Sequence, residues 1–211
     1  MELDAKQAGN TMKQGISFIV TDIEADGPDP GRHSMLSLAS VARSESGEDQ
    51  GEFTINLKPL PEAVQEAGTM RWWQTHPLAW QESTRNQLEP ETAMQAWSDW
   101  VENRPGTPVF AAHPLSFDGA WVDWYLQKFT GRRLFYRARD PGLSHGAGVD
   151  IPSIIMAKTG WEYQRCNREN YPATWLGGHD HNHRALDDAR GYAHLLTLAL
   201  TGNIHQFASG L

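Results

Sequence analysis

The chain has 211 residues, 39% hydrophobic and 21% charged, which is ordinary globular composition and long enough to bury a core. Its net charge of −8 disfavours a protein that coats long nucleic acid through a broad basic surface, but not an enzyme that grips one strand end. The sequence shows no signal-peptide or transit pattern, no membrane-spanning window and a single cysteine, Cys166. We therefore expect one domain in a reducing compartment such as the cytoplasm, without membrane association.

Three strands are predicted at the start of the chain. Ile16 to Val20 is an apolar run that ends in the acidic stretch TDIEADG, and the segments MLSLASVAR and GEFTINLK have the character of the next two strands. The polar SESGEDQ between the second and third suits a hairpin turn. These patterns predict an antiparallel three-strand meander.

Helical periodicity begins in TMRWWQTHPLAWQESTRN and continues in ETAMQAWSDWVENR, where Thr92 is the expected N-cap. The next segments are predicted as a buried strand in PGTPVFAAH and a helix in SFDGAWVDWYLQKFTG that ends at Gly131. The loop-rich stretch RRLFYRARDPGLSHGAGVD follows and could hold a fifth strand. After it we expect a short helix entered through Asp150 and Pro152, and a last helix from about Arg184 to Leu200. This order predicts an α/β fold with a mixed sheet flanked by helices. We expect residues 1–14 to form a flexible tail and residues 15–205 to form the domain.

Two carboxylates follow the first apolar run. Asp22 and Glu24 are separated by one residue, so on a strand both side chains project from the same face. Side by side near a central strand, the two carboxylates repel each other unless a cation lies between them. Because the motif is so short, the alternative is that both are simply polar residues at the end of a strand. Asp118 begins a helix after the fourth strand, where catalytic groups are often mounted, although caps are more usual there.

The stretch HNHRALDDAR offers a histidine and a further carboxylate. His183 and Asp188 are five residues apart, about 140° around a helix, so both cannot face one point from a single helix. We therefore expect His183 on the preceding loop and Asp188 on the second helical turn. Ala185 shares the face of Asp188, where a larger side chain would crowd a metal, and Asp187 is expected to serve the helix dipole or a salt bridge.

Four carboxylates without thiolates suit Mg²⁺ or Mn²⁺ rather than zinc. Two such ions about 3.5 to 4 Å apart can stabilise both the attacking and the leaving oxygen of a phosphodiester displacement. His183 could accept the proton of the attacking water, because the ordinary pKa of an imidazole is about 6.5. The pattern predicts metal-dependent phosphodiester hydrolysis.

The order DIE, HPLSFD and HRALDD resembles the three motifs of the DEDDh branch of the DEDD 3′-to-5′ exonucleases. That family includes proofreading subunits, oligoribonuclease and ribonuclease T. The resemblance implies a ribonuclease H-like, five-stranded mixed sheet and assigns the metal ligands and the general base, His183. The implied ligands are Asp22, Glu24, Asp118 and Asp188. In one departure, many relatives have Asn after the histidine of the second motif, whereas here Pro114 follows His113 and offers no side-chain amide to the substrate or the loop.

Other segments suggest substrate contacts. Trp72 and Trp73 follow the third strand, and we predict that at least one lines the substrate groove, although most tryptophans are expected in the core. His113 and Arg133, the latter from the arginine-rich RRLFYRARD, are further candidates, and a solvated loop is an equal alternative for that stretch. The alternating histidines of GHDHNH invite a zinc site, but no cysteine or second histidine cluster completes a tetrahedron.

These observations predict an exonuclease that uses two Mg²⁺ or Mn²⁺ ions and releases nucleoside 5′-monophosphates from the 3′ ends of single-stranded nucleic acid. We expect RNA or short oligonucleotides rather than DNA. The alternatives are a proofreading-type DNA exonuclease and a catalytically idle module that binds nucleic-acid ends. The family resemblance also suggests a homodimer.

Overall fold

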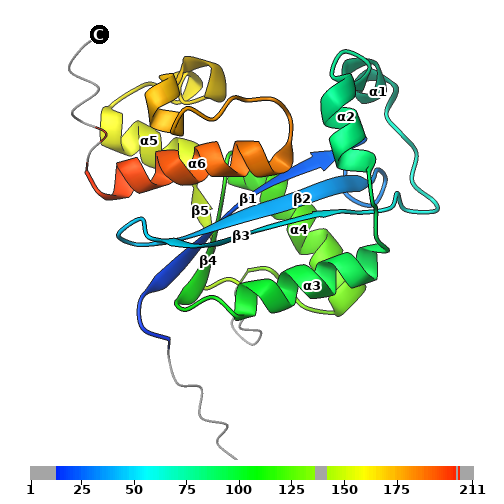
Figure 1. Ribbon diagram of the computed structural model, residues 1–211, viewed down its shortest axis with the longest axis horizontal. Helices are drawn as coiled ribbons and strands as arrows, with labels where there is room; N and C mark the ends of the chain where they lie inside the picture. The colour runs from blue at the N-terminus through cyan, green and yellow to red at the C-terminus, as the bar shows by residue number, and fades with distance from the viewer. Residues whose placement is uncertain (1–12, 136–141, 203, 205–211) are drawn as a thin grey trace, which may run out of the picture.

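The computed structural model describes residues 13–135, 142–202 and 204. Its centre is a five-stranded mixed sheet with the order β3-β2-β1-β4-β5 (Figure 1). The strands are β1 (Ile16–Ala25), β2 (Met35–Ser44), β3 (Asp49–Asn56), β4 (Thr107–Ala112) and β5 (Val149–Asp150). The first three pair antiparallel, and β4 and β5 continue the sheet in parallel with β1. The predicted meander and mixed α/β sheet are confirmed.

Six α-helices surround the sheet in the described part of the chain. They are α1 (Ala67–Trp73), α2 (Pro77–Thr84), α3 (Pro90–Glu102), α4 (Leu115–Thr130), α5 (Ile151–Thr159) and α6 (Ala185–Leu200). Three short 3₁₀ helices precede α6: η1 (Tyr163–Arg165), η2 (Arg168–Asn170) and η3 (Ala173–Leu176). None of the helices in the described ranges is both long and apolar enough to cross a membrane.

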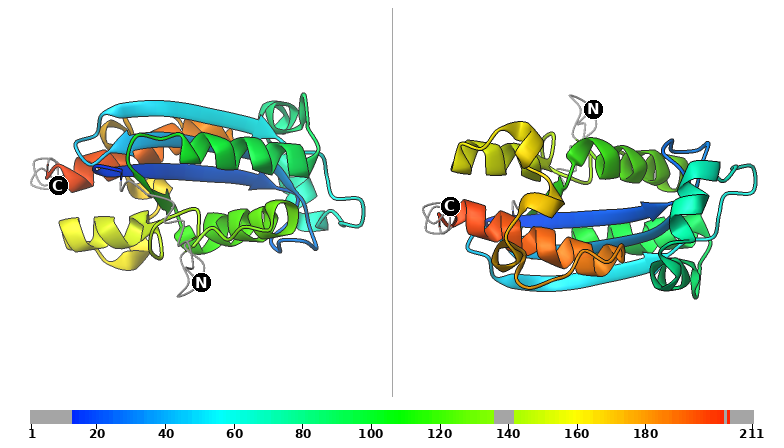
Figure 2. Two further views of the ribbon diagram at one scale, coloured as in Figure 1. Left: turned by 90° about the horizontal axis from the view of Figure 1, so that it is seen from below. Right: turned by 90° about the horizontal axis from the view of Figure 1, so that it is seen from above.

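Strand β1 separates two hydrophobic cores, and Figure 2 shows it running through the centre of the molecule between the helices. Ile19 and Ile23 pack in the core built with α3 and α4, whereas Phe18 and Val20 pack in the core built with α5 and α6. Because alternate residues of a strand face opposite sides of the sheet, the even-numbered row continues along the α6 side. The side chains that follow Val20 in this row are those of Asp22 and Glu24.

Several element boundaries differ from the sequence-based predictions. Strand β1 continues through the acidic stretch to Ala25, because β2 pairs with it along its whole length. The helical segment predicted from Thr69 is two helices, because Pro77 has no backbone N–H to continue the first and instead begins α2. The prediction of Thr92 as an N-cap is wrong, since α3 already begins at Pro90.

Other predicted boundaries are confirmed. Gly131 ends α4 in the left-handed conformation, with φ of 73°. The Asp150 side chain caps α5 by accepting a hydrogen bond from the backbone N–H of Ser153. The predicted fifth strand is the short β5 at the end of its loop-rich stretch. Most of the predicted N-terminal tail, residues 1–12, lies outside the described residues, as do 136–141 of the loop-rich stretch and residues 203 and 205 of the predicted domain.

Candidate active site

Four carboxylates from three elements meet at the carboxyl end of β1. Asp22 and Glu24 lie on β1, Asp118 in the first turn of α4 and Asp188 in the first turn of α6. Carboxylate oxygens of Asp22, Glu24 and Asp188 lie within 4.8 Å of one another. Asp118 is fixed beside them because its Oδ1 accepts a hydrogen bond of 3.2 Å from the backbone N–H of Ile23, between the two β1 acids. Asp188 thus lies one turn earlier than predicted.

The cluster is buried and carries like charges. Glu24, Asp118 and Asp188 are at most 9% exposed. Burial, followed by repulsion from the other carboxylates, raises the pKa values of Asp22 and Glu24 well above their ordinary range. Burial also raises the pKa of Asp118 to about 7, against the opposing effect of the hydrogen bond from Ile23. Without a cation, the folded chain can ionise these acids only at a free-energy cost.

The donor set fits a hard divalent cation. Asp188 Oδ1 is buried and, within the described ranges, accepts no hydrogen bond, although His181 Nδ1 lies 3.0 Å away. A buried carboxylate oxygen without a hydrogen bond is costly unless a cation approaches it. Several carboxylate oxygens and no thiolate form the kind of ligand set that Mg²⁺ and Mn²⁺ prefer. The neighbouring Asp187 faces elsewhere and pairs with Arg190 at 3.3 Å, in agreement with its predicted salt-bridge role.

His183 lies on the loop directly before α6, where the spacing argument placed it. Its backbone has a positive φ of 57°, a conformation that few residues other than glycine adopt. One of its ring nitrogens is within 4.8 Å of an Asp188 carboxylate oxygen. Burial, the neighbouring His181 and the nearby His76 lower the pKa of His183 to about 4, against the attraction of Asp188. The imidazole is therefore neutral at physiological pH and free to accept a proton.

The two adjacent tryptophans have different positions. Trp72 is 37% exposed, and its ring centroid lies 4.6 Å from that of His183. Trp73 is 2% exposed and donates its indole N–H to the carbonyl of Ala25 at 3.0 Å. Trp72 is therefore the one that could contact a substrate, and Trp73 packs beneath the end of β1.

The two other predicted substrate contacts are engaged within the protein. His113 stacks on Tyr192 with ring centroids 4.6 Å apart, and its Nε2 is hydrogen-bonded to the hydroxyl of Tyr171 at 2.9 Å. Burial lowers the pKa of His113 to about 4. The guanidinium of Arg133 pairs with Asp123 and donates to Gln127. Neither side chain is among the residues that the structure gathers around the carboxylates.

Sequence reasoning overlooked Arg184, the residue after His183. Its side chain lines a hollow of 370 Å³ shared with His76 and Asn182, and another of 310 Å³ shared with Arg85 and Arg190. Both hollows are lined by residues of α2 and by residues at or just before the start of α6. The sequence signal for it was its position within the third motif, HRALDD, directly after His183.

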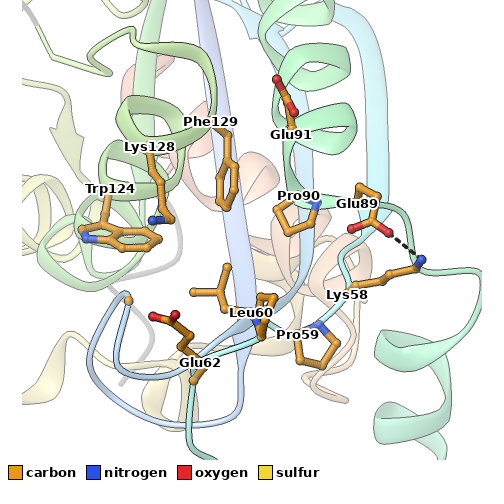
Figure 3. Close-up of a pocket in the computed structure, with 13 residues that line it drawn as sticks. Lys58, Pro59, Leu60, Glu62, Glu89, Pro90, Glu91, Trp124, Lys128 and Phe129 are labelled. Carbon is orange, nitrogen blue, oxygen red and sulfur yellow. Dashed lines mark hydrogen bonds and ion pairs between the residues drawn. The ribbon is translucent and has the colours of Figure 1, made fainter.

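A separate cavity of 660 Å³ lies among Trp124, Phe129, Leu60 and three prolines, with the ion pair of Lys58 and Glu89 at its edge (Figure 3). The residues that line it come from α3, α4 and the segments beside them. None of the five motif residues lines it, so it is distinct from the carboxylate site.

Comparison with known proteins finds one relative by sequence and several similar solved structures. No family model matches the chain. The 3′-5′ DNA exonuclease Cap18 of Escherichia coli is 28% identical over an alignment of 194 residues that covers 86% of this chain and 90% of that protein. The nuclease domain of 3′hExo, a DEDDh family member bound to rAMP, superposes with a TM-score of 0.62 at 10% identity, covering 90% of this chain and 94% of that one. E. coli exonuclease I in complex with a dT13 oligonucleotide gives 0.66 at 14% identity, covering 92% of this chain and 43% of that one.

The predicted resemblance is confirmed. The chain has the ribonuclease H-like fold of these nucleases, and its ordered motifs and clustered carboxylates resemble those of the DEDDh 3′-5′ exonucleases.

Proposed function

We propose that the protein removes nucleotides from the 3′ end of single-stranded DNA with the help of two divalent cations and releases nucleoside 5′-monophosphates. The observation that carries the proposal is the cluster of Asp22, Glu24 and Asp188, with oxygens within 4.8 Å of one another beside Asp118 and His183. DNA replaces RNA, the substrate favoured by the sequence reasoning, because Cap18 is a DNA exonuclease and exonuclease I is seen with dT13. The earlier alternative of a DNA exonuclease is thus the better supported one.

The carboxylates have the metal-binding role. Asp22, Glu24, Asp118 and Asp188 would hold two Mg²⁺ or Mn²⁺ ions, which when bound acidify water and stabilise charge on the phosphate oxygens. The backbone N–H of Ile23 keeps Asp118 facing the cluster. The pairing of β1 with β2 keeps the side chains of Asp22 and Glu24 on the same face of the sheet. These contacts hold the ligands in place before substrate arrives.

His183 has the general-base role. Its neutral imidazole accepts the proton as water attacks the terminal phosphodiester. Packing against Trp72 and His76 holds its ring beside Asp188. General-base catalysis of this kind contributes roughly 10²- to 10⁴-fold to a rate.

Trp72 and Arg184 are the proposed substrate contacts. The exposed indole of Trp72 offers a surface on which the terminal base can stack, a contact worth about 1 to 3 kcal/mol. Arg184 is placed to neutralise a backbone phosphate in the hollows between α2 and α6. Homodimer formation stays a prediction from the family resemblance.

The test uses 5′-labelled single-stranded DNA and RNA of matched sequence, incubated with Mg²⁺, Mn²⁺ or a chelator. We expect a metal-dependent ladder that shortens from the 3′ end, faster on DNA. Faster cleavage of RNA would restore the original substrate prediction, and binding without cleavage of either polymer would support the idle end-binding module.

A matched pair of variants controls the experiment. Asp188→Asn removes a buried ligand and should abolish the ladder, whereas Asp187→Asn changes the adjacent acid, which pairs with Arg190, and should leave cleavage nearly intact. A fully active Asp188→Asn protein with normal folding would overturn the mechanism.

A further inference from the structure

His181 lies against the carboxylate cluster, although it belongs to none of the three motifs. Its Nδ1 is 3.0 Å from Asp188 Oδ1, and its ring centroid is 4.2 Å from that of His183. Donor atoms of His181, His183 and Asp188 lie within 4.8 Å of one another. The geometry points to a second kind of metal site here, which takes Zn²⁺ and inhibits the enzyme.

The ligand types distinguish this site from the oxygen cluster beside it. Two imidazoles and one carboxylate form a set that Zn²⁺ favours, whereas Mg²⁺ prefers oxygen ligands and water. Three protein ligands with one position left for water is a common zinc arrangement. The sequence argument against zinc was that the histidines of GHDHNH lacked a partner from elsewhere. The fold supplies that partner from α6, as Asp188.

A separate observation indicates that a cation belongs at this point. Asp188 is 1% exposed, and its Oδ1 accepts no hydrogen bond in the described part of the chain. Its near neighbour is the His181 nitrogen, which makes close contact without hydrogen-bond geometry. A zinc ion between these atoms would use the lone pair of the nitrogen and neutralise the carboxylate oxygen.

The backbone can accommodate the small adjustment that binding requires. Tetrahedral zinc ligands with bonds of about 2.0 to 2.2 Å lie roughly 3.4 Å from one another, closer than the outer limit of 4.8 Å seen here. His181 and His183 belong to the loop between η3 and α6, outside regular secondary structure. Gly177 and Gly178, both at positive φ, begin this loop. Rotation of two imidazoles and a slight loop shift would close the site, while Asp188 stays fixed on its helix.

Zinc at this site would stop catalysis for two reasons. It would occupy a ring nitrogen of His183, which could then no longer accept a proton, and it would draw on Asp188, a ligand of the oxygen cluster. The inhibitory consequence rests on the proposed exonuclease function, whereas zinc binding itself does not. Each therefore needs its own measurement.

Binding is measured on metal-free protein by competition with a chromogenic zinc chelator, in the presence of millimolar Mg²⁺, and by the visible absorption of Co²⁺ as a zinc substitute. We expect one Zn²⁺ per chain. Loss of a residue that only hydrogen-bonds to a metal ligand weakens metal affinity by about 10- to 100-fold. Loss of His181, a direct ligand in the proposed site, should therefore lower zinc affinity by at least about tenfold. His179→Ala, which changes a histidine of the same loop outside the group, should bind as the unaltered protein does.

Inhibition is measured on the Mg²⁺-dependent cleavage of single-stranded DNA with increasing Zn²⁺. Relative to its own activity without zinc, His181→Ala should need at least about tenfold more zinc for half inhibition, in proportion to its lower zinc affinity. Equal zinc binding by His181→Ala and the unaltered protein would overturn the proposal. His181→Gln provides a second variant of similar size. Binding that depends on His181, in a protein that cleaves nothing, would retain the zinc site and reject the exonuclease function instead.

Discussion

Replacement of Asp118 by Asn should stabilise the metal-free protein while it removes a metal ligand. Asp118 is 3% exposed, and burial raises its pKa from the ordinary 3.8 to about 7. Asn has a similar shape and keeps a carbonyl oxygen that can accept the hydrogen bond from the N–H of Ile23. The substitution therefore removes the cost of a buried charge and keeps the local contact.

The sign and size of the effect follow from proton linkage. Because the pKa of Asp118 is raised in the folded state, protonation favours folding, and this contribution is lost as the pH rises through about 7. A pKa raised from 3.8 to about 7 corresponds to roughly 4 kcal/mol at about pH 8 and to roughly 2 kcal/mol at about pH 5. Asp118→Asn should be more stable than the unaltered chain by up to these amounts, with the larger gain at alkaline pH.

Urea denaturation followed by tryptophan fluorescence, with chelator present, measures this difference across the pH range. The nine tryptophans of the chain provide the signal. Excess Mg²⁺ should stabilise the unaltered protein more than the variant, because the variant lacks one ligand carboxylate. The reasoning is refuted if Asp118→Asn is no more stable than the unaltered chain at about pH 8, or if its gain does not shrink toward about pH 5.

Three further predictions concern catalysis and substrate binding. Trp72→Ala should raise KM for single-stranded DNA several-fold with little change in stability, which steady-state kinetics measures. Trp73→Ala should cost about 3 to 5 kcal/mol of stability because that side chain is buried, which urea denaturation measures. His183→Ala should lower kcat by roughly 10²- to 10⁴-fold on saturating substrate, and an unchanged kcat would remove its role as base. Arg184→Ala should reduce the slope of log affinity against log salt by roughly 0.7, while Arg133→Ala, already paired with Asp123, should leave it unaltered.

The sheet could be predicted because its apolar runs are separated by clear turn residues. The extent of β1 could not, since Asp22 to Ala25 have loop-like composition and stay in the strand only because β2 pairs with them. The N-terminus of α3 was misplaced for a local reason. Both Pro90 and Thr92 carry helix-start signals, and the chain uses the earlier one, Pro90.

The site was predictable where spacing alone constrains geometry. The alternation of Asp22 and Glu24 and the angle between His183 and Asp188 require no tertiary information. The surroundings of His183 could not be foreseen, because Trp72 is more than a hundred residues away in the chain. Nor could sequence distinguish Trp72 from Trp73, since neighbouring residues on a helix differ by about 100° and only the packed fold shows which one is covered.

The two hydrophobic cores explain why cations, and not a movement of the backbone, relieve the repulsion between the carboxylates. Ile19 and Ile23 are fixed by packing on one side of β1, and Val20 by packing on the other, so the strand between them cannot shift to separate Asp22 from Asp188. Exposed acids relieve repulsion by turning into water, but these acids lack that option. Their repulsion therefore persists in the metal-free fold, and binding of divalent cations relieves it without rearranging the backbone. A rigid, self-repelling site of this kind should gain affinity for cations because the ligands are already gathered before binding.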